Sequence, residues 1–226
     1  MGIKLVQRVE FIKKKCEGKK VLHLGCTNYP YTENSIKDGS LLHFELTKVA
    51  RDLYGLDLDE RGIAILEQHG IQKIFRADLE KLEDTNLNET FEVIIAGEVI
   101  EHLSNPGLFL NGIKRFMDQN TELVITTINA YSGMRFAIYA LRGRGGINEP
   151  VHPDHVAYYS YSTLNLVIKR SGLHVKEFYF YDVGPEHRIH NPWHYNFVND
   201  LSVMISKQLA DGVIAVCTLS SDESRG

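Results

Sequence analysis

A cluster of two carboxylates and an imidazole lies within five residues, at Glu98, Glu101 and His102, directly after the apolar run 91–97. The run has the length of a buried strand, and open α/β sheets bind their ligands just outside the carboxyl ends of the strands. The three side chains are therefore expected where a bound cofactor would lie. An imidazole there suits general-base chemistry near neutral pH, and the mixed set suits a divalent ion.

Three interpretations of this cluster remain open. In the first, Glu98 closes a pocket and His102 is the base that removes a proton from a substrate hydroxyl. In the second, Glu98, Glu101 and His102 hold a divalent metal together with His152 or His155, because positions i, i+3 and i+4 of a helix share one face. In the third, Glu98 caps the turn and the other two side chains make structural hydrogen bonds.

The elements that must position this cluster alternate between strand and helix. Short apolar runs predict strands at 20–24, 52–56, 72–76, 91–96, 122–128, 174–181 and 212–219. Apolar spacing and capping signals predict helices at 3–16, 41–51, 60–69, 106–117, 131–141, 162–171 and 196–209. Residues 28–40 are rich in turn formers and predict a long loop. This order predicts an α/β fold with a doubly wound parallel sheet and right-handed crossovers.

Composition narrows the class of protein further. The 226 residues are 43% hydrophobic, which suits one domain over 1–219 followed by a disordered tail at 220–226. A net charge of −4 implies no broad basic face, so nucleic acid is not the expected partner. The chain has three cysteines and no signal-type leader, which predicts a cytoplasmic protein. It has no apolar run of about 20 residues, so no membrane span is expected.

The residues at the ends of the predicted strands resemble those of the class I S-adenosylmethionine-dependent methyltransferases, over residues 20–219. The Gly-rich turn of that family corresponds to 21–26, its ribose-binding acid to Asp57 and its adenine-side acid to Asp78. The resemblance implies S-adenosyl-L-methionine as cofactor and a mostly parallel seven-stranded sheet with the last strand antiparallel. The cofactor-binding residues that it implies are Gly25, Cys26, Asp57, Leu58, Asp78, Leu79 and Glu98.

The first motif departs from the family pattern at two positions. His23 stands where an acid is usual, and Thr27 stands where a second glycine is usual. The following segment, 28–40, is longer than the usual tight turn. Residues 41–43 of the next predicted helix are therefore expected to line the methionine end of the pocket.

The segment 151–164 resembles the stretch after the fifth strand in methyltransferases of bacterial glycan and sugar modification, where it runs over the active site. His152, His155, Tyr158 and Tyr159 are its candidates for substrate contact. We therefore expect an O-methyltransferase acting on a sugar, a glycan precursor or another small hydroxylated molecule. Its catalytic residues are expected to be His102 as general base and His155 second. The segments 130–160 and 182–209 are expected as insertions on the substrate side, and 1–18 as an N-terminal helix.

Two alternative functions remain open. Glu-x-x-Glu-His with a later histidine resembles the small-RNA 3′-terminal ribose 2′-O-methyltransferases, which use a divalent ion, and also the ubiquinone-pathway O-methyltransferases. A metal-dependent enzyme of the first kind would bind its ion through Glu98, Glu101, His102 and His155; a metal is possible but not favoured. The altered first motif also leaves open a catalytically inactive partner protein. The expected partner is a small-molecule or glycan substrate, and the oligomeric state is left open.

Overall fold

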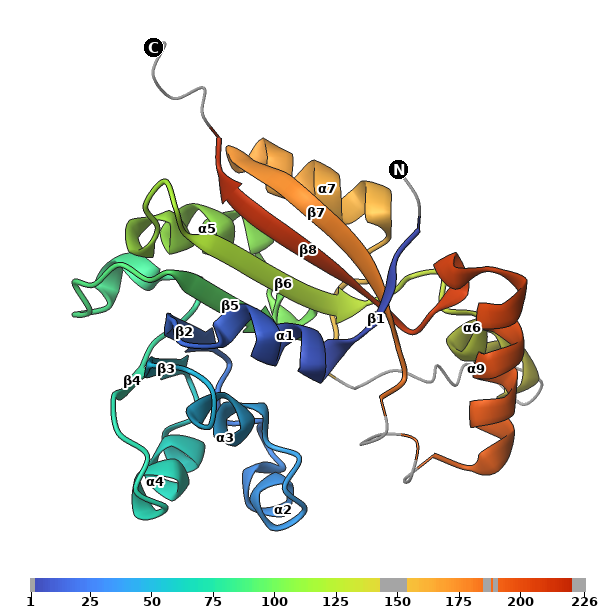
Figure 1. The fold of residues 1–226 in the computed structure, drawn as a ribbon, viewed down its shortest axis with the longest axis horizontal. Coiled ribbons are helices and arrows are strands. Elements are labelled where there is room, and N and C mark those ends of the chain that lie inside the picture. The colour runs from blue at the N-terminus through green and yellow to red at the C-terminus, as the bar shows by residue number, and fades with distance from the viewer. Residues whose placement is uncertain (1–2, 143–153, 185–187, 189–190, 221–226) are drawn as a thin grey trace.

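The computed structural model describes residues 3–142, 154–184, 188 and 191–220, and its centre is one sheet with helices on both faces (Figure 1). The strands, in chain order, are β1 (Leu5–Gln7), β2 (Lys20–Leu24), β3 (Asp52–Asp57), β4 (Ile74–Arg76), β5 (Val93–Gly97), β6 (Glu122–Ile128), β7 (Leu173–Asp182) and β8 (Gly212–Leu219). The α-helices are α1 (Arg8–Cys16), α2 (Thr32–Lys37), α3 (Leu42–Thr47), α4 (Glu60–Gln68), α5 (Pro106–Gly112), α6 (Gly133–Arg142), α7 (Tyr161–Arg170) and α9 (Trp193–Ile205). Short 3₁₀ turns are η1 (Leu82–Asp84), η2 (Ile100–His102), η3 (Ile113–Phe116) and η5 (Lys207–Leu209).

The sheet has the strand order β1-β7-β8-β6-β5-β2-β3-β4. Strand β8 runs antiparallel to both of its neighbours, β6 and β7, whereas the other pairings are parallel. The predicted doubly wound α/β fold with an antiparallel last strand is therefore confirmed. The described sheet nevertheless has eight strands, one more than the seven predicted.

The additional strand is β1, at the N-terminal edge. Residues 3–16 were predicted as one helix, and this prediction is wrong for the first residues, because Leu5–Gln7 pair in parallel with 180–182 of β7. The helix α1 begins only at Arg8. An exposed strand edge offers unpaired backbone groups to any neighbouring segment, and this tertiary pairing overrides the local helical pattern.

The core lies on both faces of the sheet. On one face, Leu22 and Ile94 pack with buried side chains of α5 and α7, and on the other, Val21 and Ile95 pack with α1 and α3. Because both faces of β2 and β5 are covered, these strands are continuous apolar runs rather than alternating ones. This burial holds the strand ends, and the loops that follow them, in fixed positions.

Several predicted elements differ in detail from the observed ones. The turn-rich segment 28–40 contains a helix, α2, and the predicted helix 106–117 changes from α5 to the tighter turn η3. Helix α7 begins one residue before the predicted 162–171, because Ser160 and Thr163 cap it reciprocally through side chain and backbone.

Helices α6 and α9 pack against each other beside the sheet (Figure 1). Met134, Ile138 and Val183 form a small core between them, with Tyr195 at its margin. They belong to the predicted insertions 130–160 and 182–209, of which residues 143–153, 185–187 and 189–190 lie outside the described part. The predicted disordered tail is also outside it, apart from residue 220. Within the described residues, no helix is long and apolar enough to cross a bilayer.

Candidate active site

A cavity of about 990 Å³ opens at the carboxyl ends of β2, β3 and β5. Its walls come from the loops that follow these strands, from the start of α1 and from the segment before α7. The helices after β2 and β5 leave the sheet on opposite faces, which makes this edge the position where doubly wound folds bind ligands. The predicted site residues that line the cavity are Gly25, Cys26, Asp57, Leu58, Asp78, Leu79, Glu98, His102 and His155.

The turn after β2 forms one wall. Gly25 has φ +67°, and a Cβ at this position would lie 2.7 Å from the Val99 side chain, so glycine is required on both counts. Thr27, which replaces the second glycine of the family pattern, donates from its backbone N–H and its hydroxyl to one oxygen of Asp57, both at 2.9 Å. A Cβ at Gly62 of α4 would lie 2.6 Å from the Thr27 Cβ. The space for threonine therefore comes from a glycine on the neighbouring helix.

Asp57 ends β3 and is only 9% exposed. Besides the two Thr27 bonds, it accepts the Asp59 backbone N–H at 3.0 Å. An ionised carboxylate has about four acceptor positions. Asp57 is thus held rigidly at the cavity wall and still has capacity for a ligand hydroxyl.

The loop after β4 forms the adjacent wall. Asp78 accepts the Glu80 backbone N–H at 2.9 Å, which fixes the carboxylate at the rim. Leu79 is buried beside it, whereas Leu58, from the loop after β3, is 54% exposed. Both acidic groups and aliphatic side chains therefore line this part of the cavity.

A pair of histidines lies behind the methionine end of the predicted pocket. His23 of β2 and His43 of α3 are 2% and 0% exposed, and their Nδ1 atoms are 3.1 Å apart. Their rings are nearly parallel. Of the predicted residues 41–43, Leu41 and Leu42 line the cavity. His43 does not, but it contacts His23, which does. His23, one of these two buried imidazoles, thus stands where the family pattern has an acid.

This pair is expected to make the protein sensitive to acid. Burial lowers the pKa of His43 from 6.5 to about 4, and burial, then the charges of His43 and Arg8, lowers that of His23. As the pH falls from 6.5 towards 4, the unfolded chain binds protons that the folded chain does not, so stability present above pH 6.5 is lost. By about pH 5 the loss from His43 alone is about 2 kcal/mol.

Thermal unfolding at about pH 7.5 and about pH 5 measures this loss. The His43→Gln variant should show a shallower dependence on pH than the natural protein, because one of the two buried imidazoles is removed while His23 remains. His69→Gln, at an exposed position, is the matched control and should keep the natural slope. Equal slopes in all three proteins would show that the acid sensitivity arises elsewhere.

Glu98 lies at the end of β5 in the left-handed region, with φ +58°. The Tyr181 hydroxyl donates to its carboxylate at 2.5 Å, and an Arg8 nitrogen lies 3.9 Å from it. Burial and then the charge of Glu98 raise the pKa of Tyr181 well above 10, so this hydroxyl keeps its proton and remains a donor. Sequence reasoning missed Arg8 and Tyr181, because only the pairing of β1 with β7 brings them to the site.

Glu101 is fully buried and does not line the cavity. Neither of its carboxyl oxygens forms a well-aligned hydrogen bond, although the Thr127 hydroxyl lies beside it. Burial, and then the negative charge of Glu98, raises the pKa of Glu101 to about 8. Its backbone carbonyl accepts from Val156 and Ala157 at 2.8 and 3.2 Å, which ties the segment before α7 across the strand ends.

This tie brings His155 to His102. The two ring centres are 4.6 Å apart with nearly perpendicular planes, and both residues line the cavity. Of the other candidates in the segment, Tyr159 is buried in the core, Tyr158 is 38% exposed, and neither lines the cavity. His152 lies outside the described residues.

The predicted metal-binding set is not assembled. In the described part of the chain, no group of three or more His, Cys, Asp or Glu side chains lies close enough to hold an ion. The prediction placed Glu98, Glu101 and His102 on one face of an α-helix. Glu98 instead precedes the turn in a left-handed conformation, and η2 is a 3₁₀ turn of three residues, so the α-helical face that the prediction required does not form. Glu101 is buried, whereas Glu98 and His102 line the cavity.

Comparison with known proteins decides the family. The family described as the methyltransferase domain matches residues 4–177, most of the chain. The chain belongs to this methyltransferase family. The fold and the family are those of the S-adenosylmethionine-dependent methyltransferases, as the strand-end residues predicted.

Relatives of this methyltransferase include enzymes named ubiquinone biosynthesis O-methyltransferase. The one from Pseudomonas aeruginosa is 22% identical over 211 residues, covering 87% of this chain and 81% of its own. The one from Azorhizobium caulinodans is 28% identical over 118 residues, covering 50% of this chain and 42% of its own. The one from Bradyrhizobium diazoefficiens is 24% identical, and the match covers 69% of this chain and 62% of its own. The chain thus spans less than two thirds of the latter two proteins.

Solved structures show the same fold at low sequence identity. An S-adenosylmethionine-dependent methyltransferase from Mesorhizobium loti has a TM-score of 0.58 and 14% identity, with 93% of this chain and 95% of that chain covered. Magnesium protoporphyrin IX methyltransferase from Synechocystis, solved with bound S-adenosylhomocysteine, has a TM-score of 0.58 and 13% identity, with 94% and 82% covered. None of the relatives named here has a name that refers to glycan modification, so the predicted glycan class does not follow from them.

Proposed function

We propose that this methyltransferase transfers the methyl group of S-adenosylmethionine to a hydroxyl oxygen of a small, ring-shaped acceptor. One observation carries the proposal: a single cavity has Gly25, Asp57 and Asp78 on the side of β2 to β4, and His102 with His155 on the side of β5. The first side matches an adenosine-bearing cofactor, and the second supplies groups that accept a proton.

Each wall has a distinct proposed role in holding the cofactor. Asp57, rigidly bonded to Thr27, would accept the ribose hydroxyls through charge-assisted hydrogen bonds. Asp78 and Leu79 would contact the adenine. The backbone of the turn at Gly25 and Cys26 would approach the cofactor closely, because glycine has no side chain to intervene. Leu58 and Glu98 complete the proposed set, on either side of the ribose.

The chemistry required of the protein is modest. The sulfonium of the cofactor supplies an activated methyl group, so the residues need to align the acceptor oxygen and take its proton. His102 is exposed in the cavity and suits the second task, and His155 packs against its ring and restricts its orientation. The buried Glu101 cannot take this role, because its carboxyl group does not reach the cavity.

The acceptor is proposed to be a hydroxylated ring. Tyr29 and Tyr31 line the cavity and are 64% and 54% exposed, so they offer aromatic faces at its mouth. Such faces stack on planar rings and also on the apolar face of a sugar. The names of the relatives favour hydroxylated aromatic compounds of the ubiquinone type, and the resemblance of 151–164 favours sugars as the second class.

Calorimetric titration with S-adenosylmethionine and S-adenosylhomocysteine tests the cofactor site, and we expect micromolar dissociation constants. A panel of catechols and sugars, followed by release of S-adenosylhomocysteine, then identifies the acceptor. Repeating the active reactions in EDTA and after return of Mg²⁺ determines whether any ion takes part. No binding of either cofactor form at millimolar concentration would refute the proposal.

Arg8 is expected to bind the carboxylate of the methionine moiety. It lines the cavity with a side chain only 12% exposed, 3.9 Å from Glu98 and over the ring of Tyr181. The Arg8→Met variant should raise the dissociation constant for S-adenosylmethionine about 10- to 100-fold, because a charge-assisted pair is lost. Lys4→Met, on the same N-terminal segment, is the control. An unchanged affinity in Arg8→Met would place the carboxylate elsewhere.

A further inference from the structure

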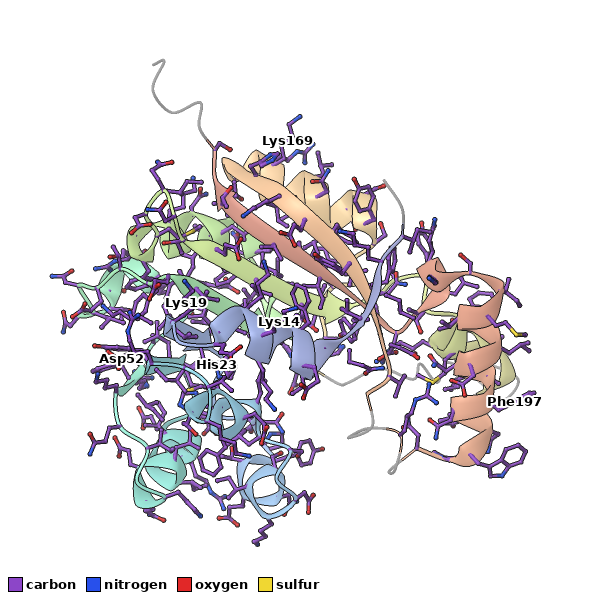
Figure 2. The ribbon with its side chains drawn as sticks, in the orientation of Figure 1. Lys14, Lys19, His23, Asp52, Lys169 and Phe197 are labelled. Carbon is purple, nitrogen blue, oxygen red and sulfur yellow. The ribbon has the colours of Figure 1, made fainter. Side chains whose placement is uncertain are left out.

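Helix α9 presents its apolar side to solvent. Along one face, at helical spacing, lie five large apolar side chains with high exposed fractions: Trp193 78%, Phe197 61%, Leu201 43%, Met204 77% and Ile205 72%. Figure 2 shows Phe197 on the side of the helix that faces away from the sheet. Surface helices normally bury such a stripe.

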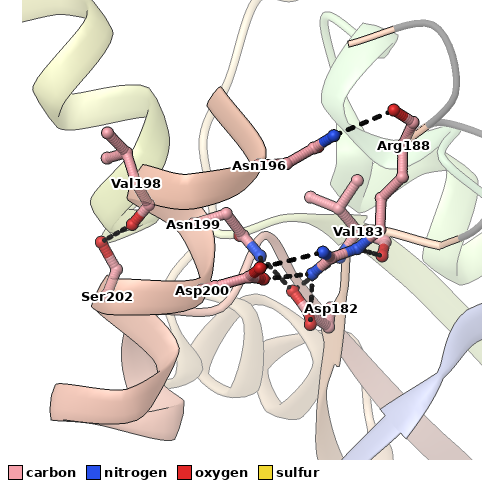
Figure 3. Close-up of polar contacts among 8 residues, drawn as sticks. All are labelled: Asp182, Val183, Arg188, Asn196, Val198, Asn199, Asp200 and Ser202. Atoms are coloured by element: carbon pink, nitrogen blue, oxygen red, sulfur yellow. Dashed lines mark hydrogen bonds and ion pairs between the residues drawn. The ribbon is translucent and has the colours of Figure 1, made fainter. Parts of the chain in front are cut away.

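Polar side chains on the other faces of α9 bond the helix to the rest of the chain. Asn199 is fully buried and donates to Asp182 at 2.6 Å. Asn196 donates to the Arg188 carbonyl at 2.9 Å, and Arg188 pairs with Asp200 at 2.5 Å and with Asp182 at 3.2 Å (Figure 3). These bonds fix the rotation of the helix about its own axis, so the apolar face cannot turn inward.

The exposed apolar area is large for one helix. With about 150–250 Å² for a side chain of this size, the five exposed fractions amount to roughly 600 Å². Phe136 and Tyr139 of α6, the helix that packs against α9, are also 74% and 43% exposed. The largest apolar patch of a monomer is typically about 300–600 Å², and each partner of a standard interface buries about 800 Å².

We propose that a second copy of this chain covers the apolar face of α9 and makes the protein a twofold dimer. In an antiparallel pairing of the two α9 helices, the aromatic end with Trp193 and Phe197 meets the aliphatic end with Met204 and Ile205. A twofold axis forms both contacts at once, and aromatic rings pack well against methionine. Asp200, at the edge of the stripe, is already neutralised by Arg188, so the approach brings no unpaired like charges together.

Other ways to cover this face fit less well. The segment 143–153, which follows α6 in the sequence, contains only two aliphatic side chains, Ile147 and Val151, too few to cover this face. Helices that lie on anionic membranes carry lysine and arginine on their polar face, and α9 contains neither. A copy of the same stripe supplies a matching apolar surface of the same length.

Sedimentation equilibrium over about 1–100 µM protein tests the proposal. The natural chain should sediment at twice its 25.7 kDa mass. Phe197→Asp and Met204→Asp should each raise the dimer dissociation constant at least about 100-fold, because each charge is buried twice. Both positions are exposed in the single chain, so thermal unfolding of the dissociated variants should remain cooperative.

Leu166→Asp on α7, at 47% exposure, is the matched control and should leave the mass unchanged. A natural chain that is monomeric at 100 µM would overturn the proposal, as would a dimer that both α9 variants leave intact. Co-sedimentation with vesicles of neutral and of anionic lipid is measured in parallel. Binding of a monomer to vesicles would assign the face to a membrane and refute the dimer.

Discussion

Replacement of His102 by glutamine is expected to lower kcat about 10²- to 10⁴-fold, the usual contribution of a general base. Glutamine keeps a polar side chain of similar length but cannot take a proton from the acceptor hydroxyl. The affinity for S-adenosylmethionine should stay within about twofold of the natural value, because His102 lies on the β5 side of the cavity, opposite Asp57 and Asp78. Single-turnover rates at saturating cofactor and acceptor measure the effect.

His155→Gln distinguishes catalysis from positioning. His155 contacts the ring of His102 at 4.6 Å between ring centres, so its loss should lower kcat by less than the loss of His102 does. His174→Gln, on the exposed part of β7, is the control and should leave the rate unchanged. An unchanged kcat in His102→Gln would refute the general-base role and direct attention to His155.

The Asp57→Asn variant is expected to raise the dissociation constant for S-adenosylmethionine about 100-fold. The asparagine side chain has nearly the same shape, but it loses the negative charge that makes the ribose hydrogen bonds strong. Calorimetric titration measures the affinity, and circular dichroism establishes that the variant is folded. The same loss should be seen with S-adenosylhomocysteine, because both molecules carry the ribose.

Thr27→Val separates the charge of Asp57 from its positioning. This variant removes one of the two 2.9 Å bonds from Thr27 to Asp57, but it leaves the carboxylate charged. We expect an increase of less than about tenfold in the dissociation constant. If Thr27→Val weakens binding as much as Asp57→Asn does, the carboxylate acts mainly by holding the turn and not by binding the ribose.

Local sequence patterns were sufficient to predict the strands other than β1 and the residues at their ends. Gly25 and Asp57 directly follow predicted strands, Asp78 comes two residues after one, and each of the three lines the cavity. Parallel strands buried on both faces are continuous apolar runs, and their carboxyl ends meet at one edge of the sheet. The residues that follow the runs are therefore brought together whatever the intervening loops do.

Contacts between distant segments decided the parts of the site that were missed. Arg8 reaches Glu98 because β1 pairs with β7, about 175 residues later in the chain, and a helical pattern gave no sign of this pairing. The proposed metal set failed because a single left-handed residue, Glu98, and a 3₁₀ turn redirected Glu101 into the core. Backbone conformations of this kind depend on the segments that pack against them in the folded chain.

The sequence by itself determined the fold class, the positions of the central strands along the chain and the wall of the cavity proposed to hold the cofactor, because buried strands are visible in the local pattern of apolar residues. Only the tertiary structure decided the pairing of His23 with His43, the contact of His102 with His155 and the outward apolar face of α9. Each of these depends on the relative position of segments far apart in the chain, and for α9 on a polar network that outweighs the preference of its apolar side chains for the interior. The physical reason is that the side-chain pattern of an element shows which of its faces could be buried. The segments that pack against it in the folded chain decide which face is actually buried.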